Sequence, residues 1–183
     1  MASLGIPNPR TTAFVLVDVQ DKLFPHIHDN QRIVDNANTL LESAYLLESP
    51  IIVTEQYPKG LGHTVQDIQV PSTGTYVEKV AFSCTDSDQF MDHLKRLDAN
   101  TLVLFGIESH ICVTKTALGA MDAGYDVHVV ADGVSSRTAE NKQIGIERMR
   151  QSGAFIASTE MILFQMLELA GTDTFKKISK MVK

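Results

Sequence analysis

Cys112 is the residue of this chain whose type and position best suit nucleophilic chemistry. It ends an apolar run that begins at residue 102, and it stands at the predicted start of a helix. A thiol at a helix N-terminus lies near the positive end of the helix dipole and near free backbone N–H groups, which lower its pKa and favour the nucleophilic thiolate. The alternative is an inert thiol packed in the core, the common state of free cysteines. Position alone does not decide between the two.

Asp18 and Lys79 are charged residues at the ends of apolar segments. Asp18 follows four apolar residues, where a carboxylate is costly unless it is paired or hydrogen-bonded. A helix N-cap or a turn would also explain it, but no clear helix begins at Val19. Lys79 alone would be interpreted as a solvated lysine at a strand end. Ligands of doubly wound sheets bind beyond the carboxyl ends of the strands, which is where Asp18 and Cys112 are expected.

The elements that must position these residues are short apolar runs that alternate with segments of helical period. The runs are continuous, as in strands that are buried on both faces of a parallel sheet. We therefore expect an α/β fold in three layers, with a doubly wound, six-stranded, mostly parallel sheet and helices on both faces. The predicted strands are residues 12–19, 51–54, 76–80, 101–105, 125–131 and 154–158, and the predicted helices cover residues 33–47, 90–97, 117–121, 144–149, 160–169 and 173–181.

Length and composition limit the class of protein. The chain of 183 residues is expected to form one domain over residues 1–183 and to bury roughly 70% of its unfolded surface. Two cysteines make a disulfide framework improbable and favour a reducing, cytoplasmic location. The N-terminus lacks the features of a signal peptide, and no apolar run reaches the ~20 residues that span a bilayer, so no membrane association is expected. A net charge of −6 with scattered basic residues argues against nucleic acid as a partner.

Residues 55–75 form the longest predicted loop, which follows a strand and contains Tyr57, Gly60, Gly62 and His63. Long ordered loops are usually functional, so this segment is expected to act as a substrate lid. The alternative is a mobile surface excursion.

The sequence resembles the isochorismatase-like cysteine hydrolase superfamily. The resemblance is carried by Asp18, Lys79 and the segment GIESHICV at 106–113, and it covers nearly the whole chain. The strings VTEQYPKGLG at 53–62, VHVV at 127–130, SSR at 135–137 and RMRQSGAF at 148–155 are similar to the isochorismatase-domain-containing protein 1 and 2 group. The resemblance implies a homo-oligomer and a catalytic triad in which Cys112 is the nucleophile, Asp18 accepts the thiol proton, and Lys79 stabilises thiolate and carboxylate.

The resemblance also implies how the reaction is supported. The backbone N–H groups of Glu108 and Cys112 would form the oxyanion hole, and the peptide bond between Ile107 and Glu108 would be cis. The substrate pocket is expected at Gln20, Phe24, Gln56 and Tyr57. The implied reaction is hydrolysis of a small amide, imide or ester through a covalent thioester-type intermediate. True isochorismatases often lack the cysteine, so isochorismate is not the expected substrate.

No metal and no other cofactor is expected. Nicotinamidases of the same superfamily carry an Asp-x-His metal pair after the second strand, where this chain has Glu55, Gln56 and Tyr57. Glu55 and His63 could still contribute to a divergent site, so a nicotinamidase-like amidase stays an alternative.

Further alternatives concern the thiols and the nucleotide-binding folds. His110 could form a Cys–His dyad with Cys112, although a pocket-lining or solvent position is favoured. Cys84 could act as a resolving thiol, although packing is the commoner role. A noncatalytic or redox-sensing binding protein on the same fold is therefore a second hypothesis. A Rossmann or flavodoxin-like nucleotide-binding domain is disfavoured, because no Gly-x-Gly-x-x-Gly follows the first strand.

Overall fold

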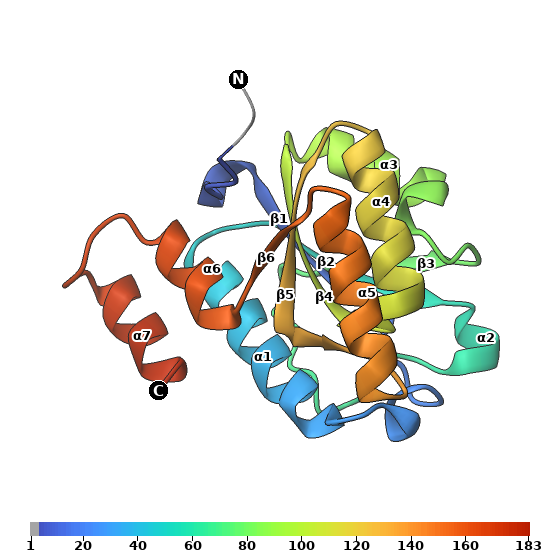
Figure 1. The fold of residues 1–183 in the computed structure, drawn as a ribbon. Helices are drawn as coiled ribbons and strands as arrows, with labels where there is room; N and C mark the ends of the chain where they lie inside the picture. The colour runs from blue at the N-terminus through green and yellow to red at the C-terminus, as the bar shows by residue number, and fades with distance from the viewer. Residues whose placement is uncertain (1–3) are drawn as a thin grey trace.

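A six-stranded sheet forms the middle layer of the computed structural model, which describes residues 4–183 (Figure 1). The strands are β1 (Thr12–Val17), β2 (Ile51–Gln56), β3 (Thr75–Lys79), β4 (Thr101–Ile107), β5 (Asp126–Ser135) and β6 (Phe155–Ala157). Their order is β3-β2-β1-β4-β5-β6, and every neighbouring pair is parallel. The predicted fold class is confirmed. The strand order changes direction at β1 and β4, which places the topological switch point beside Asp18.

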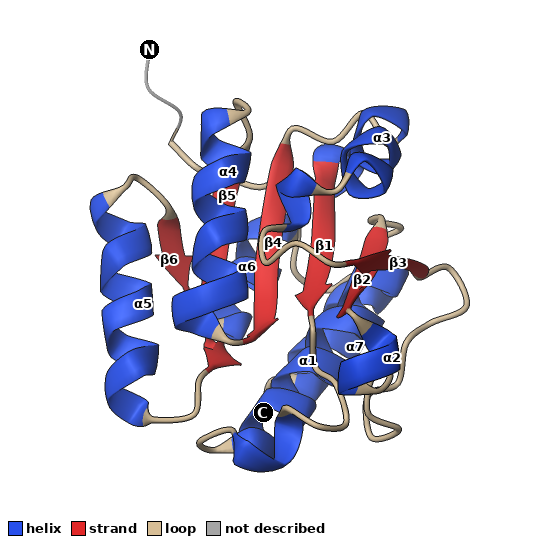
Figure 2. Ribbon diagram, turned by 90° about the vertical axis from the view of Figure 1, so that its right-hand side faces the viewer, coloured by secondary structure: helices blue, strands red, loops and turns tan. Residues whose placement is uncertain are grey.

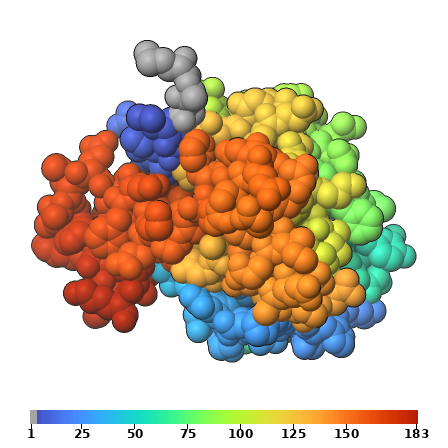
Figure 3. Space-filling view, viewed as in Figure 1, coloured from blue at the N-terminus to red at the C-terminus, as the bar shows by residue number. Residues whose placement is uncertain are grey.

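Helices cover both faces of this sheet (Figure 2). One face carries α1 (Asn30–Leu46), α6 (Thr159–Met166) and α7 (Asp173–Met181), and the other carries α3 (Asp88–Arg96), α4 (Thr114–Asp122) and α5 (Ala139–Gln151). The short helix α2 (Pro58–Leu61) lies beyond the end of β2. At the C-terminus α7 packs its buried Ile178 into the α1 face, and the red C-terminal segment protrudes at one side of the space-filling view (Figure 3).

Burial on both faces explains the continuous apolar pattern of the strands. In β1 every residue is buried: Phe14 and Leu16 pack on the α1 side, whereas Val15 and Val17 pack on the α4 side. None of the helices in residues 4–183 combines the length and apolarity needed to cross a membrane. The first three residues of the N-terminal stretch, in which no signal peptide is expected, lie outside the described residues.

The prediction of an irregular loop over residues 55–75 was wrong at its start. Parallel pairing with β3 extends β2 to Gln56, with Glu55 opposite Glu78 and Gln56 opposite Lys79. A helical turn, α2, follows directly, and an antiparallel bridge joins Thr64 to Gln20. Hydrogen bonds to β3 determine where β2 ends. The polar residues of this segment give no apolar pattern from which that end could be predicted. The remaining loop is therefore shorter than expected and is tied to the chain that follows β1.

Gly106 permits the close approach of β1 and β4 at their carboxyl ends. Its φ is +114°, and a Cβ atom there would lie 2.3 Å from the carbonyl oxygen of Val17, its partner in the parallel register. Any side chain at this position would push the two strands apart. The glycine thus brings the residue after β1, Asp18, next to the turn that follows β4.

Candidate functional site

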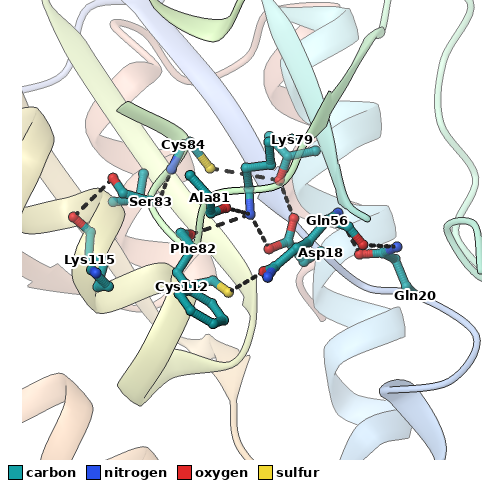
Figure 4. A network of polar contacts seen from close by, with 12 residues as sticks. Asp18, Gln20, Gln56, Lys79, Ala81, Phe82, Ser83, Cys84, Cys112 and Lys115 are labelled. Carbon is teal, nitrogen blue, oxygen red and sulfur yellow. Dashed lines mark hydrogen bonds and ion pairs between the residues drawn. The ribbon is translucent and has the colours of Figure 1, made fainter. Parts of the chain in front are cut away.

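A buried ion pair joins the ends of β1 and β3. Asp18 is the first residue after β1 and has a left-handed backbone, with φ of 50°, so the chain turns away from the strand there. Lys79 is the last residue of β3, and its Nζ lies 2.6 Å from Oδ2 of Asp18. Both side chains are fully buried. Sequence reasoning singled out these two residues, and the structure brings them together (Figure 4).

Neighbouring residues form hydrogen bonds with the polar atoms of Asp18 and Lys79 that the ion pair does not use. The hydroxyl of Thr54 donates to Oδ1 of Asp18 at 2.7 Å. Besides Asp18, the ammonium of Lys79 donates to the carbonyl oxygens of Ala81 at 3.2 Å and Phe82 at 3.3 Å. Burial lowers the pKa of Lys79. The charge of Asp18 and the hydrogen bond to it raise that pKa by more than burial lowers it, so the net shift is upward. Lys79 is therefore a protonated cation with an acceptor for each of its three N–H bonds.

Cys112 lies in a single π-helical turn, Ser109–Val113, that leads from β4 into α4. Its S–H group donates to Oε1 of Gln56 at 3.0 Å, and only 6% of the residue is exposed. The prediction of a lowered thiol pKa was wrong. Burial raises the pKa of Cys112 well above its usual range, the charge of Asp18 raises it further, and the charge of Lys79 opposes this only in part. Loss of contact with water outweighs the nearby helix N-terminus and the lysine.

The segment before the thiol folds back on Glu108. The peptide bond between Ile107 and Glu108 is cis. The carbonyl oxygen of Glu108 accepts the N–H groups of Ile111 at 3.0 Å and Val113 at 3.2 Å, which closes the turn around Cys112. Glu108 and Cys112 thus belong to one tight turn at the carboxyl end of β4, and an oxyanion hole formed by their backbone N–H groups stays a prediction.

The expected pocket residues divide into two groups. Gln56 contacts the thiol, and the side chain of Gln20 binds the backbone of Gln56. The amide nitrogen of Gln20 donates to the carbonyl oxygens of Gln56 at 3.0 Å and Gly62 at 2.6 Å. Its amide oxygen accepts a hydrogen bond from the N–H of Gln56 at 2.8 Å. The partner atom in each of these bonds belongs to the backbone, so the side chain of Gln20 holds the end of β2 in place. Tyr57 follows with a side chain that is half exposed, whereas Phe24 packs against the core on the α1 side.

Sequence reasoning missed Thr54 and underrated Cys84. Thr54 is opposite Val17 in the β1–β2 register, so its position at the end of a predicted strand, beside Asp18, was the available signal. Cys84 is fully buried, and its thiol lies 3.8 Å from the hydroxyl of Thr54. Burial raises the pKa of Cys84 to about 11. Figure 4 shows the sulfur atom of Cys112 toward Gln56 and apart from that of Cys84.

The polar residues considered for a metal are bound to one another. Oε1 of Glu55 accepts the N–H of Thr64 at 2.7 Å and its hydroxyl at 2.8 Å, and Oε2 lies 2.9 Å from Nδ1 of His63. Burial raises the pKa of Glu55, but the hydrogen bonds from Thr64 and His63 give a net lowering. Across residues 4–183, no three His, Cys, Asp or Glu side chains are grouped to hold a metal ion. His110 contacts the hydroxyl of Ser136 at 2.9 Å through Nδ1.

Comparison with known proteins agrees with this fold. A profile of the isochorismatase domain matches residues 12–161. The chain is 38% identical to isochorismatase domain-containing protein 2 of Xenopus laevis, over 98% of this chain and 87% of that protein. It is 34% identical to a solved structure described as a putative MAR1 ribonuclease from Leishmania donovani, with a TM-score of 0.91 over 100% of this chain and 96% of that one.

A more distant solved structure shares the fold. It is an octameric hydrolase of unknown specificity from Escherichia coli, 23% identical, with a TM-score of 0.79 over 87% of this chain and 81% of that one, so it supports the fold alone. The profile match and the full-length relatives confirm the resemblance seen in the sequence: the chain belongs to the isochorismatase family.

Proposed function

We propose that this protein is a cysteine hydrolase that cleaves a small amide, imide or ester through a thioester on Cys112. The observation that carries the proposal is the fully buried pair of Asp18 and Lys79, 2.6 Å apart, beside a thiol that is the more exposed of the two cysteines. A buried charge pair costs desolvation energy, and titratable groups of this kind concentrate at catalytic sites. Asp18, Lys79 and Cys112 then form the catalytic triad.

The first step is attack by sulfur coupled to proton transfer. Because the pKa of Cys112 is raised, the resting thiol keeps its proton, and the carboxylate of Asp18 accepts that proton as the Sγ–C bond forms. The carbonyl π electrons move to oxygen, and the resulting oxyanion accepts hydrogen bonds from the backbone N–H groups of Glu108 and Cys112. Removing one such donor typically costs a factor of ~10²–10³ in rate. Lys79 fixes the carboxylate and balances its charge.

The second half of the reaction restores the thiol. The tetrahedral intermediate collapses, the C–N or C–O bond breaks, and the leaving group takes the proton from Asp18. Water then attacks the thioester carbonyl while Asp18 accepts one of its protons. The second tetrahedral intermediate collapses, the C–S bond breaks with its electrons on sulfur, and the proton held by Asp18 returns to the sulfur of Cys112 as the acid product departs. The amide of Gln56, which accepts the S–H group at rest, holds the thiol in position before attack.

Exposure distinguishes the two thiols. Both lie near the Asp18–Lys79 pair and in the apolar cluster of the α4 face, but Cys84 has no exposed surface. Cys112 retains 6% exposure at the carboxyl edge of the sheet, the edge at which doubly wound sheets bind ligands. We therefore assign the thioester to Cys112.

The proposed substrate is small and is not a nucleic acid. Although a structural relative is described as a ribonuclease, a net charge of −6 disfavours binding of a polyanion. The protein also forms a homo-oligomer in this proposal. Large apolar side chains are exposed around the edge strand β3, and a distant relative is octameric; the exposed residues are Tyr57, Tyr76, Val80 and Phe82. Light scattering that gives the monomer mass of about 20 kDa would contradict the oligomer.

The test is a screen of small amides, imides and esters with intact-protein mass spectrometry. Wild-type protein is expected to hydrolyse at least one compound and to show an acyl adduct that maps to Cys112. Cys112→Ala is expected to lose both signals. Cys84→Ala is the matched control, because it removes the only other thiol of the sequence, and it is expected to keep them. Turnover that persists in Cys112→Ala, or an adduct that maps to Cys84, would overturn the assignment.

A further inference from the structure

Arg137 lies beside the thiol-bearing turn at the carboxyl edge of the sheet. It follows β5 by two residues, and Ser135, the last residue of β5, is opposite Ile107 at the end of β4. Adjacent strands are ~4.8 Å apart, so the chain after β5 runs along the chain after β4. Figure 2 shows the arrowheads of β1, β4 and β5 at the same lower edge. Arg137 is therefore placed one strand beyond the turn that carries Cys112.

Hydrogen bonds fasten the two segments together. The hydroxyl of Ser136 lies 2.6 Å from that of Ser109 and 2.9 Å from Nδ1 of His110, and both partners belong to the thiol-bearing turn. The hydroxyls of Ser109 and Ser136 are completely buried. The position of Arg137 relative to Cys112 is thus set by a buried polar contact, unlike that of an ordinary surface arginine.

Glu108 holds the guanidinium by one edge. Its Oε1 accepts hydrogen bonds from Nε–H of Arg137 at 2.9 Å and from the backbone N–H of Arg137 at 3.3 Å. The carboxylate is only 10% exposed, whereas the arginine side chain is 58% exposed. Among residues 4–183, no hydrogen-bond partner accepts from the two terminal nitrogens of Arg137. An arginine bound through Nε still offers the parallel N–H pair of its outer edge, which matches a carboxylate.

The other cation of the site cannot provide such donors. Each N–H of Lys79 already has an acceptor, in Asp18, Ala81 or Phe82. The pair with Glu108 engages only Nε of the guanidinium, so it leaves the two terminal nitrogens of Arg137 available for another acceptor.

We propose that Arg137 is a specificity-determining residue that binds the carboxylate of an anionic acyl substrate at the Cys112 site. This proposal rests on the proposed hydrolase function, and it narrows the substrate class to small acyl compounds that carry a carboxylate near the scissile bond. Glu108 is the positioning residue: it orients the guanidinium so that its outer N–H pair is available to the substrate.

Two alkylating agents of similar size test the proposal without requiring turnover. Iodoacetate is anionic and iodoacetamide is neutral, and in both reactions the sulfur of Cys112 forms a bond to the methylene carbon as iodide leaves with the bonding electrons. The thiol proton passes to the buffer. Rate constants for Cys112 are measured at pH 8 by peptide mass spectrometry. The iodoacetate-to-iodoacetamide ratio is normalised to that of N-acetylcysteine.

Arg137→Gln is expected to lower the normalised ratio about ten-fold, as for the loss of a charged hydrogen bond. Arg148→Gln, which removes an exposed arginine near the far end of α5, is the matched control and is expected to leave the ratio at the wild-type value. Circular dichroism verifies folding. If the glutamine variant is unstable, Arg137→Lys keeps the charge, loses the planar fork and is expected to lower the ratio about three-fold.

A wild-type ratio in the Arg137 variants would overturn the inference and leave the hydrolase proposal intact. Conversely, failure of every acyl compound to acylate Cys112 would overturn the proposed function without changing the alkylation ratios. The two failures are therefore distinguishable.

Discussion

Replacement of Lys79 by methionine tests the energetics of the buried ion pair. Methionine keeps most of the aliphatic volume and removes the ammonium group. The variant loses a charge-assisted hydrogen bond of 2.6 Å and two weaker bonds to carbonyl oxygens at 3.2 and 3.3 Å. Counted at ~1.5–3 kcal/mol for the bond to Asp18 and ~0.5–1.5 kcal/mol for each of the two longer bonds, the loss is about 2.5–6 kcal/mol. Removal of one partner of a buried ion pair costs a similar amount.

Thermal and urea unfolding measure this loss. For a chain of this length, ~1 kcal/mol corresponds to roughly 2–4 °C, so Lys79→Met should lower Tm by on the order of 10 °C. The variant leaves the carboxylate of Asp18 buried without its cation, although the hydroxyl of Thr54 still donates to it. The double variant Asp18→Asn/Lys79→Met removes both charges. It should be more stable than Lys79→Met alone, with a coupling free energy of about 2 kcal/mol between the two positions.

Two results would refute this reasoning. One is a Lys79→Met protein within about 1 kcal/mol of wild type, which would mean that the pair is not held in a desolvated environment. The other is a double variant whose loss equals the sum of the single losses, because additive losses mean that the two groups do not interact. Acylation of Cys112 should be lost in the single variants Asp18→Asn and Lys79→Met and in the double variant, so activity alone cannot distinguish them and unfolding must be measured.

The remaining predictions concern pH. Because burial and the charge of Asp18 raise the pKa of Cys112, its alkylation by iodoacetamide should keep accelerating as the pH rises from 7 to 9, and Lys79→Met should slow it at each pH; a plateau below pH 8 in wild-type protein would contradict this. Burial lowers the pKa of His128, whose ring stacks on Phe155 and whose nitrogens bind no described residue. The unfolded chain therefore binds more protons as the pH falls below 6.5, and the free energy of unfolding should decrease there by at most ~1.4 kcal/mol per pH unit from this residue. His128→Leu should flatten the urea-unfolding curve against pH only in part, since burial also lowers the pKa of His93; an unchanged slope would exclude His128 as a source.

Much of the fold could be predicted because strands that are buried on both faces consist of consecutive apolar residues. The strands β1 and β4 are buried throughout, so their apolar runs are continuous and readable. The ends of β2 and β5 could not be predicted in the same way. There the strands continue through polar residues such as Gln56 and Ser135, which are held by pairing with a neighbouring strand. Pairing is a property of the sheet, and a local pattern does not contain it.

The site shows the same division between residue type and environment. Asp18, Lys79 and Cys112 could be singled out because each stands where an apolar segment ends. The contacts of Thr54 and Gln56 depend on parallel register, and register follows only from the completed sheet. The direction of the Cys112 pKa shift was also beyond the sequence. Helix position suggests a lowered value, whereas burial, which depends on the whole fold, raises it.

The strand order explains how one small site can hold a cation, a proton acceptor and a protonated thiol. From β3 to β5 the edge carries Lys79, Gln56, Asp18, Cys112 and Arg137 in turn. Asp18 stands at the centre, so in the proposed mechanism its carboxylate is shared between a permanent ion pair with Lys79 and transient acceptance of the thiol proton. A raised thiol pKa then limits reaction with chance electrophiles. Only a compound that is held at the carboxyl edge with its carbonyl at the sulfur gains from coupled proton transfer, and for that reason substrate positioning, rather than intrinsic thiol reactivity, should determine the rate.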